Sequence, residues 1–389
     1  MKIAVPKETH PGEQRVALAP ESCKKLVKAG FAVAVEAGAG ESAFFSDDAY
    51  RDAGATVEKD LAQLLGSADF VLKVNPPVTD AGRNEVAAMR QGTFLLAGLQ
   101  PLRNLGAVRA LAERGITSFS TDAIPRISRA QSMDTLSAMA NIAGYKGVLL
   151  GAAELNKYFP MLMTAAGMVP AAKVFVIGAA VAGLQAIATA RRLGATVSAT
   201  DVRPEVKEQI ESVGAKYVGI ELKESASAGG GYAKELSEED KARQREMLAD
   251  QCAAVDVVVT TALIGGVFAP KLINKEIVAR MKPGSVIVDL AADGGGNCEL
   301  SKPGETVVVN GVTILAPLNL AATMPTHASL LFSRNLTAFL LAFAKEGGQF
   351  NFDLTDEIQQ GALITHEGEI KHGRTKDAME KAAGAVAAR

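Results

Sequence analysis

The chain has 389 residues, a formal net charge of −2 at pH 7, and a composition of 48% hydrophobic and 22% charged residues. These values are ordinary for a globular enzyme, and the length exceeds what one hydrophobic core usually serves, so we expect two domains. A near-zero net charge without a basic stripe argues against nucleic-acid binding, and no segment reads as a bilayer span. Cys23, Cys252 and Cys298 are far apart and lack metal-ligand spacing, so we expect thiols in a reducing compartment and no bound metal.

The first 120 residues alternate short β-rich runs with helical patterns. Pro20 lies in the first turn of one helical pattern and Gly30 follows its end, as expected of a helix start and stop. Alternation of this kind builds a parallel sheet with helices on both faces, here without a nucleotide fingerprint. The expected strands are residues 1–6, 32–36, 70–74, 94–97 and 116–120, and the expected helices are residues 20–29 and 104–114.

Two long helices are expected to connect the domains. The first runs from about residue 129 to 158 and carries Gly144, Gly147 and Gly151 at three- and four-residue steps, so another backbone is able to approach that face closely. The second follows Pro325 and ends near residue 344.

A polar cluster marks the start of the first long helix. Gln131, Asp134, Ser137 and Asn141 recur at three- and four-residue spacings, which would place them on one face of that helix. Such a stripe beside two arginines indicates a ligand-binding cleft between the domains. The alternative is structural, because Ser128 and Gln131 have the spacing of a capping box and the other polar groups would then face water.

Residues 173–203 form the most informative stretch, in which a β-rich run, a glycine turn, a helical pattern and a second β-rich run follow one another. This is the pattern of a βαβ dinucleotide-binding unit. Gly178 permits the turn, Gly183 permits close packing of helix on strand, and the helix N-terminus offers N–H groups to a pyrophosphate. Ala180 replaces the middle glycine of the motif, so a plain βαβ element remains the alternative.

Asp201 ends the second β-rich run, where a carboxylate would accept hydrogen bonds from an adenosine ribose. A free carboxylate there would repel a 2′-phosphate and favour NAD over NADP. Arg203 is the one nearby group that would serve a 2′-phosphate instead.

An insertion at residues 221–247 interrupts the second domain. It contains a run of glycines beside Tyr232 and then a charged helix-like piece, so we expect a mobile loop, either functional or a plain surface loop. The remaining expected elements are strands at residues 255–260, 285–289 and 312–315 and a hairpin within residues 362–371.

Proton-transfer chemistry has no clear candidate in the sequence. Dehydrogenases of alcohols, hydroxy acids or amino acids need a group that takes or gives a proton as hydride moves, commonly histidine or lysine. The four histidines, His10, His327, His366 and His372, lie in no run that indicates an active site. No motif for nucleophilic catalysis is present either.

Several motifs are distinctive. The most specific is Pro-Arg-Ile-Ser-Arg-Ala-Gln-Ser-Met-Asp at residues 125–134. The others are Met163-Thr-Ala-Ala-Gly, Val181-Ala-Gly-Leu-Gln-Ala-Ile-Ala-Thr-Ala, Gly230-Gly-Tyr-Ala-Lys-Glu, Thr260-Thr-Ala-Leu-Ile and Gly295-Gly-Asn-Cys. Together they resemble the NAD(H)-binding component of proton-translocating nicotinamide nucleotide transhydrogenase, over essentially the whole chain.

The related alanine dehydrogenase family shares the opening pattern that includes Arg15-Val-Ala-Leu, and Asp293 matches its aspartate. Its members have a catalytic histidine after the strand that corresponds to residues 94–99, where this chain has Gln100-Pro101. Under the transhydrogenase resemblance this loss is consistent, because hydride that passes directly between two nicotinamides moves no proton at the reacting carbons. Lys73 and Arg15 are then vestiges of a substrate pocket or structural charges.

The residues and the resemblance imply an α/β fold of two Rossmann-like, doubly wound parallel-sheet domains joined by long helices. Residues 1–128 and 325–389 would form the first domain and residues 129–324 the second, NAD(H)-binding domain. The resemblance further implies that NADP(H) binds to a partner component and that membrane-spanning transhydrogenase subunits translocate protons. The chain itself would be a cytoplasmic homodimer, peripheral on the inner face of the membrane.

The resemblance also assigns roles to residues. The expected catalytic residues, which would hold the nicotinamide or close over the nucleotide, are Arg126, Gln131, Asp134, Ser137 and Tyr232. The expected nucleotide-binding residues are Arg126, Ile127, Ser128, Arg129, Gln131, Asp134, Ser137, Gly178, Ala180, Val181, Gly183, Asp201, Val202, Arg203, Gly231, Tyr232, Gln244 and Leu263. Two alternative functions remain: an alanine-dehydrogenase-like NAD-dependent amino acid oxidoreductase, and a non-catalytic NAD-sensing subunit.

Overall fold

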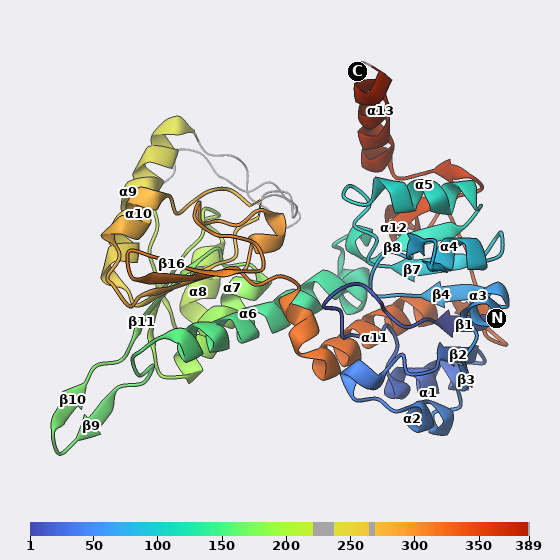
Figure 1. Cartoon of the computed structure of the whole chain (residues 1–389), viewed down its shortest axis with the longest axis horizontal. Coiled ribbons are helices and arrows are strands. Elements are labelled where there is room, and N and C mark those ends of the chain that lie inside the picture. The colour runs from blue at the N-terminus through green and yellow to red at the C-terminus, as the bar shows by residue number, and fades with distance from the viewer. Residues whose placement is uncertain (221–236, 264–268, 388–389) are drawn as a thin grey trace. The chain divides into compact units, whose positions relative to one another are not determined.

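The structure is a computed structural model that describes residues 1–220, 237–263 and 269–387, the last five of these by their backbone (Figure 1). The chain divides into two compact units: unit 1 comprises Met1–Met139 and Ala322–Arg389, and unit 2 comprises Ala140–Ala321. The sequence placed these divisions after residues 128 and 324. Helix α6 (Thr135–Glu154) begins in unit 1 and continues into unit 2.

Unit 1 is built on an eight-stranded sheet in the order β21-β20-β8-β7-β4-β1-β2-β3. The strands from β8 to β3 run parallel, and the hairpin predicted in the tail adds β20 and β21 antiparallel at one edge. The strands are β1 (Lys2–Val5), β2 (Ala32–Glu36), β3 (Thr56–Glu58), β4 (Phe70–Leu72), β7 (Phe94–Ala97), β8 (Thr117–Ser120), β20 (Leu363–His366) and β21 (Glu369–Ile370). The helices are α1 (Pro20–Lys28), α2 (Asp47–Asp52), α3 (Leu61–Gly66), α4 (Glu85–Ala88), α5 (Leu105–Glu113), α11 (Pro325–Ala342), α12 (Glu357–Ala362) and α13 (Gly373–Ala387).

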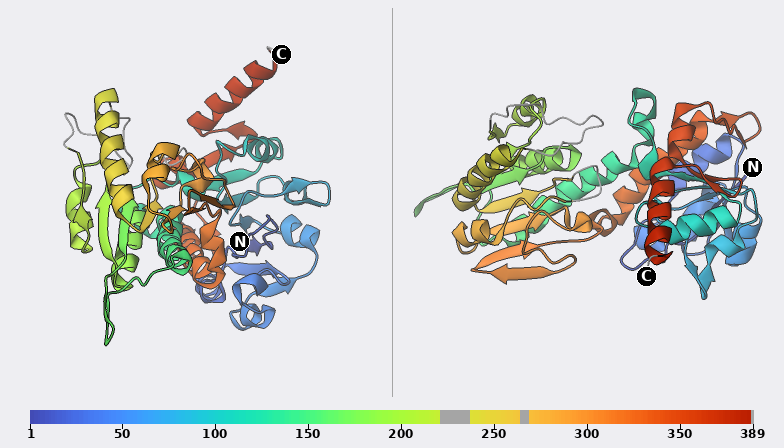
Figure 2. Two further views of the ribbon diagram at one scale, coloured as in Figure 1. Left: turned by 60° about the vertical axis from the view of Figure 1, so that its left-hand side comes forward. Right: turned by 90° about the horizontal axis from the view of Figure 1, so that it is seen from above.

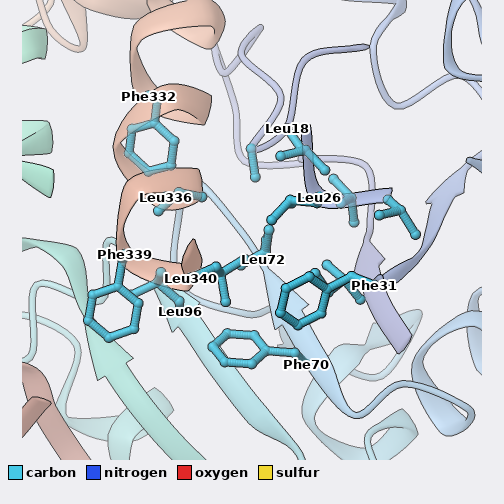
Figure 3. Close-up of a cluster of buried hydrophobic side chains, with 14 of the residues drawn as sticks. Leu18, Leu26, Phe31, Phe70, Leu72, Leu96, Phe332, Leu336, Phe339 and Leu340 are labelled. Atoms are coloured by element: carbon cyan, nitrogen blue, oxygen red, sulfur yellow. The ribbon is translucent and has the colours of Figure 1, made fainter. Parts of the chain in front are cut away.

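The core of unit 1 joins residues from the two ends of its sequence. Phe332, Leu336, Phe339 and Leu340 of α11 are buried and face side chains of the sheet such as Leu72 (Figure 3). Their three- and four-residue spacing puts them on one face of the helix. Each buried side chain of this size stabilises the fold by about 1.5–3 kcal/mol, so α11 is held in unit 1 by packing.

Unit 2 is built on a seven-stranded sheet in the order β13-β12-β11-β14-β15-β17-β16, parallel except for β16. The chain order of its strands reverses at β11, which lies between β12 and β14, and ligands of doubly wound sheets bind at such a switch point. The strands are β11 (Lys173–Ile177), β12 (Thr196–Thr200), β13 (Lys216–Tyr217), β14 (Val257–Thr260), β15 (Val286–Asp289), β16 (Thr306–Val309) and β17 (Val312–Leu315). The helices are α7 (Val181–Arg192), α8 (Val206–Ser212), α9 (Glu238–Ala254) and α10 (Lys275–Arg280). The predicted fold class, with two doubly wound parallel-sheet units, is confirmed.

The glycines of α6 have the packing role that the sequence indicates. A Cβ atom built on Gly144 would lie 2.1 Å from the backbone oxygen of Ala182, at the start of α7. Gly147 similarly approaches the side chain of Leu290. The backbone of α6 therefore lies directly against the first turn of α7.

Two predicted elements differ from the structure. The expected helix from residue 129 is a 3₁₀ helix, η3 (Ser128–Met133), followed by α6, because Asp134 is extended and its carboxylate accepts a hydrogen bond from the backbone N–H of Ser137 at 2.8 Å. In the expected mobile loop, α9 already begins at Glu238, where Ser237 caps it. Residues 221–236 lie outside the described residues.

A hairpin that the sequence does not announce projects from the body of unit 2 (Figures 1 and 2). It consists of β9 (Leu162–Thr164) and β10 (Gly167–Val169), which pair antiparallel. Met161, Met163 and Met168 are more than half exposed on and beside it.

Candidate nucleotide-binding site

The turn after β11 is packed so closely that two of its positions require glycine. Gly178 has a φ of 90°, and a Cβ atom on it would lie 2.8 Å from Oγ1 of Thr261. A Cβ atom on Gly183 would lie 1.9 Å from the backbone oxygen of Gly178. Both glycines predicted from the motif therefore hold the first turn of α7 against the end of β11.

The N-terminus of α7 is available to an anion. Among the described residues no side chain caps it, and the N-cap residue is Ala180. The first N–H groups of a helix have no acceptor within the helix and carry its positive partial charge, which suits a phosphate. Ala180 has φ −78° and ψ −166°, values that any residue adopts, so alanine causes no backbone strain there.

Asp201 follows β12 and is not the free carboxylate that the sequence led us to expect. Its Oδ1 accepts from Nε of Arg203 at 2.9 Å, and its Oδ2 accepts from Nη2 of Arg203 at 2.8 Å. Its Oδ2 also accepts from the backbone N–H of Ala179 at 2.8 Å, which ties it to the glycine turn. The hydrogen bond to Asp201 raises the pKa of the Arg203 guanidinium, so the pair is ionised.

The loop after β14 completes the switch point. Oγ1 of Thr261 donates to the backbone oxygen of Gly178 at 2.9 Å, so this loop lies against the glycine turn. Leu263, another predicted contact, is exposed two residues further on. Loops after β11, β12 and β14 thus meet at the carboxyl ends of adjacent strands, where open α/β sheets bind their ligands.

The other predicted contacts of unit 2 are less informative. Val181, in the first turn of α7, is exposed, while Val202 and Gln244 are half-buried, Gln244 on α9. Gly231 and Tyr232 lie outside the described residues, so their expected role as a cover over the nucleotide stays a prediction.

The polar cluster belongs to unit 1 up to Met139, and it does not form the single helical stripe that its spacing predicts. Gln131 lies in η3, whereas Asp134 precedes α6 and its Oδ2 accepts from Oγ of Ser137 at 2.6 Å. The predicted capping box is also wrong, because η3 begins after Ile127 without a side-chain cap. Asp134, which accepts from both the N–H and the hydroxyl of Ser137, has the capping role instead.

The remaining residues of the cluster differ in their surroundings. Arg126, Ser128 and Gln131 are exposed, and Ile127 packs against the core of unit 1. Arg129 is exposed and forms an ion pair with Asp356, at the start of α12, with Nη1 and Oδ2 2.7 Å apart. The predicted site residues therefore fall into two groups, one in each unit.

Three further residues of unit 2 support the switch point, and sequence patterns alone missed their role. They are Thr261, Asp289 and Asn297. Their only signal was that the Thr260 and Gly295 motifs take part in the family resemblance.

Two family descriptions together cover nearly all of the chain. Residues 4–143 match the family described as "Alanine dehydrogenase/PNT, N-terminal domain", and residues 147–373 match "Alanine dehydrogenase/PNT, C-terminal domain". The chain belongs to the alanine dehydrogenase/PNT family.

Members of the alanine dehydrogenase/PNT family resemble the chain to different degrees. The first portion of NAD(P) transhydrogenase subunit alpha from Rhodospirillum rubrum is 50% identical over 376 residues, which are 96% of this chain and 98% of that protein. "The crystal structure of transhydrogenase from Sinorhizobium meliloti" superposes with a TM-score of 0.86 at 44% identity, covering 95% of this chain and 100% of that one. "Alanine dehydrogenase" of Halomonas elongata is 31% identical over 386 residues, 97% of each chain.

The two cations that the alanine dehydrogenase resemblance singled out are neutralised in this family member. Arg15 forms a bidentate pair with Glu13, in which Nε lies 2.7 Å from Oε1 and Nη2 lies 2.6 Å from Oε2. Nζ of Lys73 is buried between Glu8, at 3.3 Å, and Glu85, at 3.1 Å. Both cations thus have carboxylate partners supplied by the protein.

The sequence also predicted that this family member has no bilayer span. Across residues 1–220, 237–263 and 269–387, no helix combines the length and the apolar character that crossing a membrane requires.

Proposed function

We propose that this chain is the NAD(H)-binding subunit of a transhydrogenase and exchanges hydride with NADP(H) held on a partner component. The observation that carries the proposal is the uncapped N-terminus of α7 at the switch point of the unit 2 sheet, beside Asp201. A pyrophosphate fits the first and an adenosine ribose the second. The identity to transhydrogenase subunits over almost the whole chain supports the same assignment.

Each group of residues has a task in this proposal. In unit 2, the N–H groups at the start of α7 bind the pyrophosphate, and Asp201 accepts from the ribose while Arg203 holds the carboxylate in place. In unit 1, Arg126, Gln131, Asp134 and Ser137 orient the nicotinamide end. Bound NADH supplies the hydride, and the protein contributes placement rather than proton transfer.

The histidines are consistent with direct hydride exchange. All four lie in unit 1, and three of them have structural partners. Nε2 of His10 contacts the backbone oxygen of Pro76 at 2.9 Å, Nδ1 of His366 contacts Oγ1 of Thr117 at 3.0 Å, and Nδ1 of His372 contacts Oγ1 of Thr375 at 2.7 Å. A transfer that moves no proton leaves these contacts undisturbed.

The amino acid oxidoreductase alternative requires a free cation for the substrate carboxylate. Arg15 and Lys73 would each have to leave a buried carboxylate to serve it. Breaking a buried ion pair leaves an uncompensated charge, which is strongly destabilising. The pairing of these two residues therefore supports the transhydrogenase assignment over the alternative.

We further propose that the chain forms a homodimer through the β9–β10 hairpin and associates with membrane-spanning partner subunits. Residues 158–172 carry no charge, and Met163 and Met168 are 68% and 61% exposed. A two-stranded hairpin with exposed apolar side chains is marginally stable alone and is typical of an interaction site.

A mixing experiment tests the proposed function. The purified chain is titrated with NADH, and reduction of an NADP analogue by NADH is followed with and without the NADP(H)-binding component. We expect NADH binding by the chain alone and hydride transfer only in the mixture. Reduction of NAD by an amino acid, with the chain alone, would favour the dehydrogenase alternative, and binding without transfer in the mixture would favour a sensor.

A further inference from the structure

A fully buried carboxylate organises the loop after β15. Asp289 accepts five hydrogen bonds, from Oγ1 of Thr260 at 2.9 Å, the N–H groups of Ala291 at 3.2 Å, Asn297 at 3.1 Å and Cys298 at 3.0 Å, and Oγ of Ser301 at 2.6 Å. Residues 291–301 therefore wrap around one carboxylate group. Such a group is stable when buried only because its lone pairs find donors.

Asn297, which this loop presents, holds the neighbouring loop by its side chain. Its Oδ1 accepts from the N–H of Ala262 at 2.9 Å, and its Nδ2 donates to the backbone oxygens of Ala262 and Pro270, both at 2.9 Å. The side chain is fully buried. It thus fixes Ala262 through both backbone groups and ties it to Pro270 further along the chain.

Ala262 in turn borders the glycine turn of the candidate site. Its N–H nitrogen lies 3.2 Å from the position of a Cβ atom on Gly178, and the adjacent Thr261 bonds to the backbone oxygen of Gly178. A displacement of residues 261–263 would therefore change the space in which the turn begins α7. A chain of direct contacts leads from Asp289 through Asn297 and Ala262 to Gly178.

We propose that Asp289 and Asn297 are positioning residues for nucleotide binding, which set the place of residues 261–263 at the switch point. This inference rests on the proposed function of unit 2 as the NAD(H) site. Neither residue needs to touch the nucleotide, since both act through Ala262.

Asn297→Asp is the sharpest variant, because it keeps the size of the side chain and an acceptor for Ala262 but removes both donated hydrogen bonds. We expect the Kd for NADH to rise by about tenfold or more, since small misplacements of a binding group have effects of this size. Amide hydrogen exchange within residues 261–263 should also become faster.

Asp256→Asn is the matched control for a general loss of stability. Asp256 is a buried carboxylate at the opposite, amino end of β14, where it accepts from Nζ of Lys157 at 2.6 Å and from the N–H of Lys173 at 2.9 Å. We expect this variant to lower the unfolding temperature while the Kd for NADH stays within about twofold of wild type. Ser301→Ala, which removes a single donor to Asp289, serves if Asn297→Asp does not fold, and it should raise the Kd at least about threefold.

The outcomes separate this inference from the function on which it rests. If wild type binds NADH and both Asn297→Asp and Ser301→Ala bind it equally well, or if Asp256→Asn weakens binding as much, the positioning role is overturned. Wild-type protein that does not bind NADH would contradict the proposed function and this inference with it.

Discussion

Arg203 and Asp201 form a closed bidentate ion pair at the carboxyl end of β12, with guanidinium contacts of 2.9 and 2.8 Å. The pair is nearly buried, so the carboxylate is held in one orientation and its charge is balanced by the protein. Discrimination against a 2′-phosphate therefore depends on this pair remaining closed, rather than on the carboxylate alone.

Asp201→Asn opens the pair. We expect the Kd for NADH to rise about tenfold through loss of a charged acceptor, and the preference for NADH over NADPH to decrease, because Arg203 is released to meet a 2′-phosphate. Fluorescence titration with both nucleotides measures this. Asp250→Asn, in the exposed pair with Arg280 at 2.6 Å, is the control and should change neither Kd. An unchanged nucleotide preference in Asp201→Asn would refute the role of the pair.

Gly183→Ala tests the packing of α7 on the glycine turn. The new methyl group would lie 1.9 Å from a backbone oxygen, so α7 must shift, and we expect a loss of about 3 kcal/mol or more in stability together with weaker NADH binding. Thermal unfolding and titration measure the two effects. Gly106→Ala in α5 has nothing within 4 Å of the new Cβ atom and should stabilise the chain by up to about 1 kcal/mol. Equal effects of the two substitutions would be incompatible with the packing described.

Glu13 makes stability depend on pH. Burial alone would raise its pKa, but hydrogen bonds from Arg15 and Asn75 and the charge of Arg15 lower it to about 2 from the ordinary 4.5. A lowered pKa contributes stability above pH 4.5 that is lost as the pH falls towards 2, on the order of 3 kcal/mol in all.

Glu13→Gln should therefore be much less stable than wild type at pH 7, and the difference should shrink as the pH falls through this range. Unfolding of both proteins at several pH values measures it. The surface variant Glu21→Gln, which loses exposed pairs with Lys25 and Arg334, should differ little from wild type at any pH. A difference for Glu13→Gln that does not depend on pH would contradict this account.

The hairpin of unit 2 predicts the oligomeric state. Met163→Glu combined with Met168→Glu places charges on its exposed apolar side chains, and we expect the dimer to become monomeric at micromolar concentration, as measured by light scattering. NADH binding should persist, because the hairpin belongs to neither group of candidate site residues. Val308→Glu, on the exposed face of β16, is the control. A dimer broken by this control and not by the hairpin variant would place the interface elsewhere.

The sequence predicted those elements whose signal is local. β2, β7 and β17 coincide with their predicted ranges because β-rich runs there are bounded by turn residues. Gly178 and Gly183 were found for the same reason, since the βαβ motif sets their spacing. The start of α6 was misplaced because helical periodicity continues through Asp134, whereas its carboxylate caps the helix and leaves the residue itself extended.

Other features depend on contacts distant in sequence. Ala262 and Asn297 are 35 residues apart, and no pattern in the chain announces their hydrogen bonds. The pairing of Asp201 with Arg203 is local, but nothing in the sequence shows whether that arginine turns towards the carboxylate or towards a phosphate. The β9–β10 hairpin was missed because its strands are short and carry no alternating apolar pattern.

Direct transfer of hydride is the central claim, and isotope labelling tests it most directly. NADH carrying deuterium at the transferred position is mixed with NADP, this chain and the NADP(H)-binding component, and the label is followed by mass spectrometry. We predict that the deuterium appears in NADPH and none in water, because no protein group takes part in the transfer. Loss of the label to water, or absence of labelled NADPH in the complete mixture, would contradict the account.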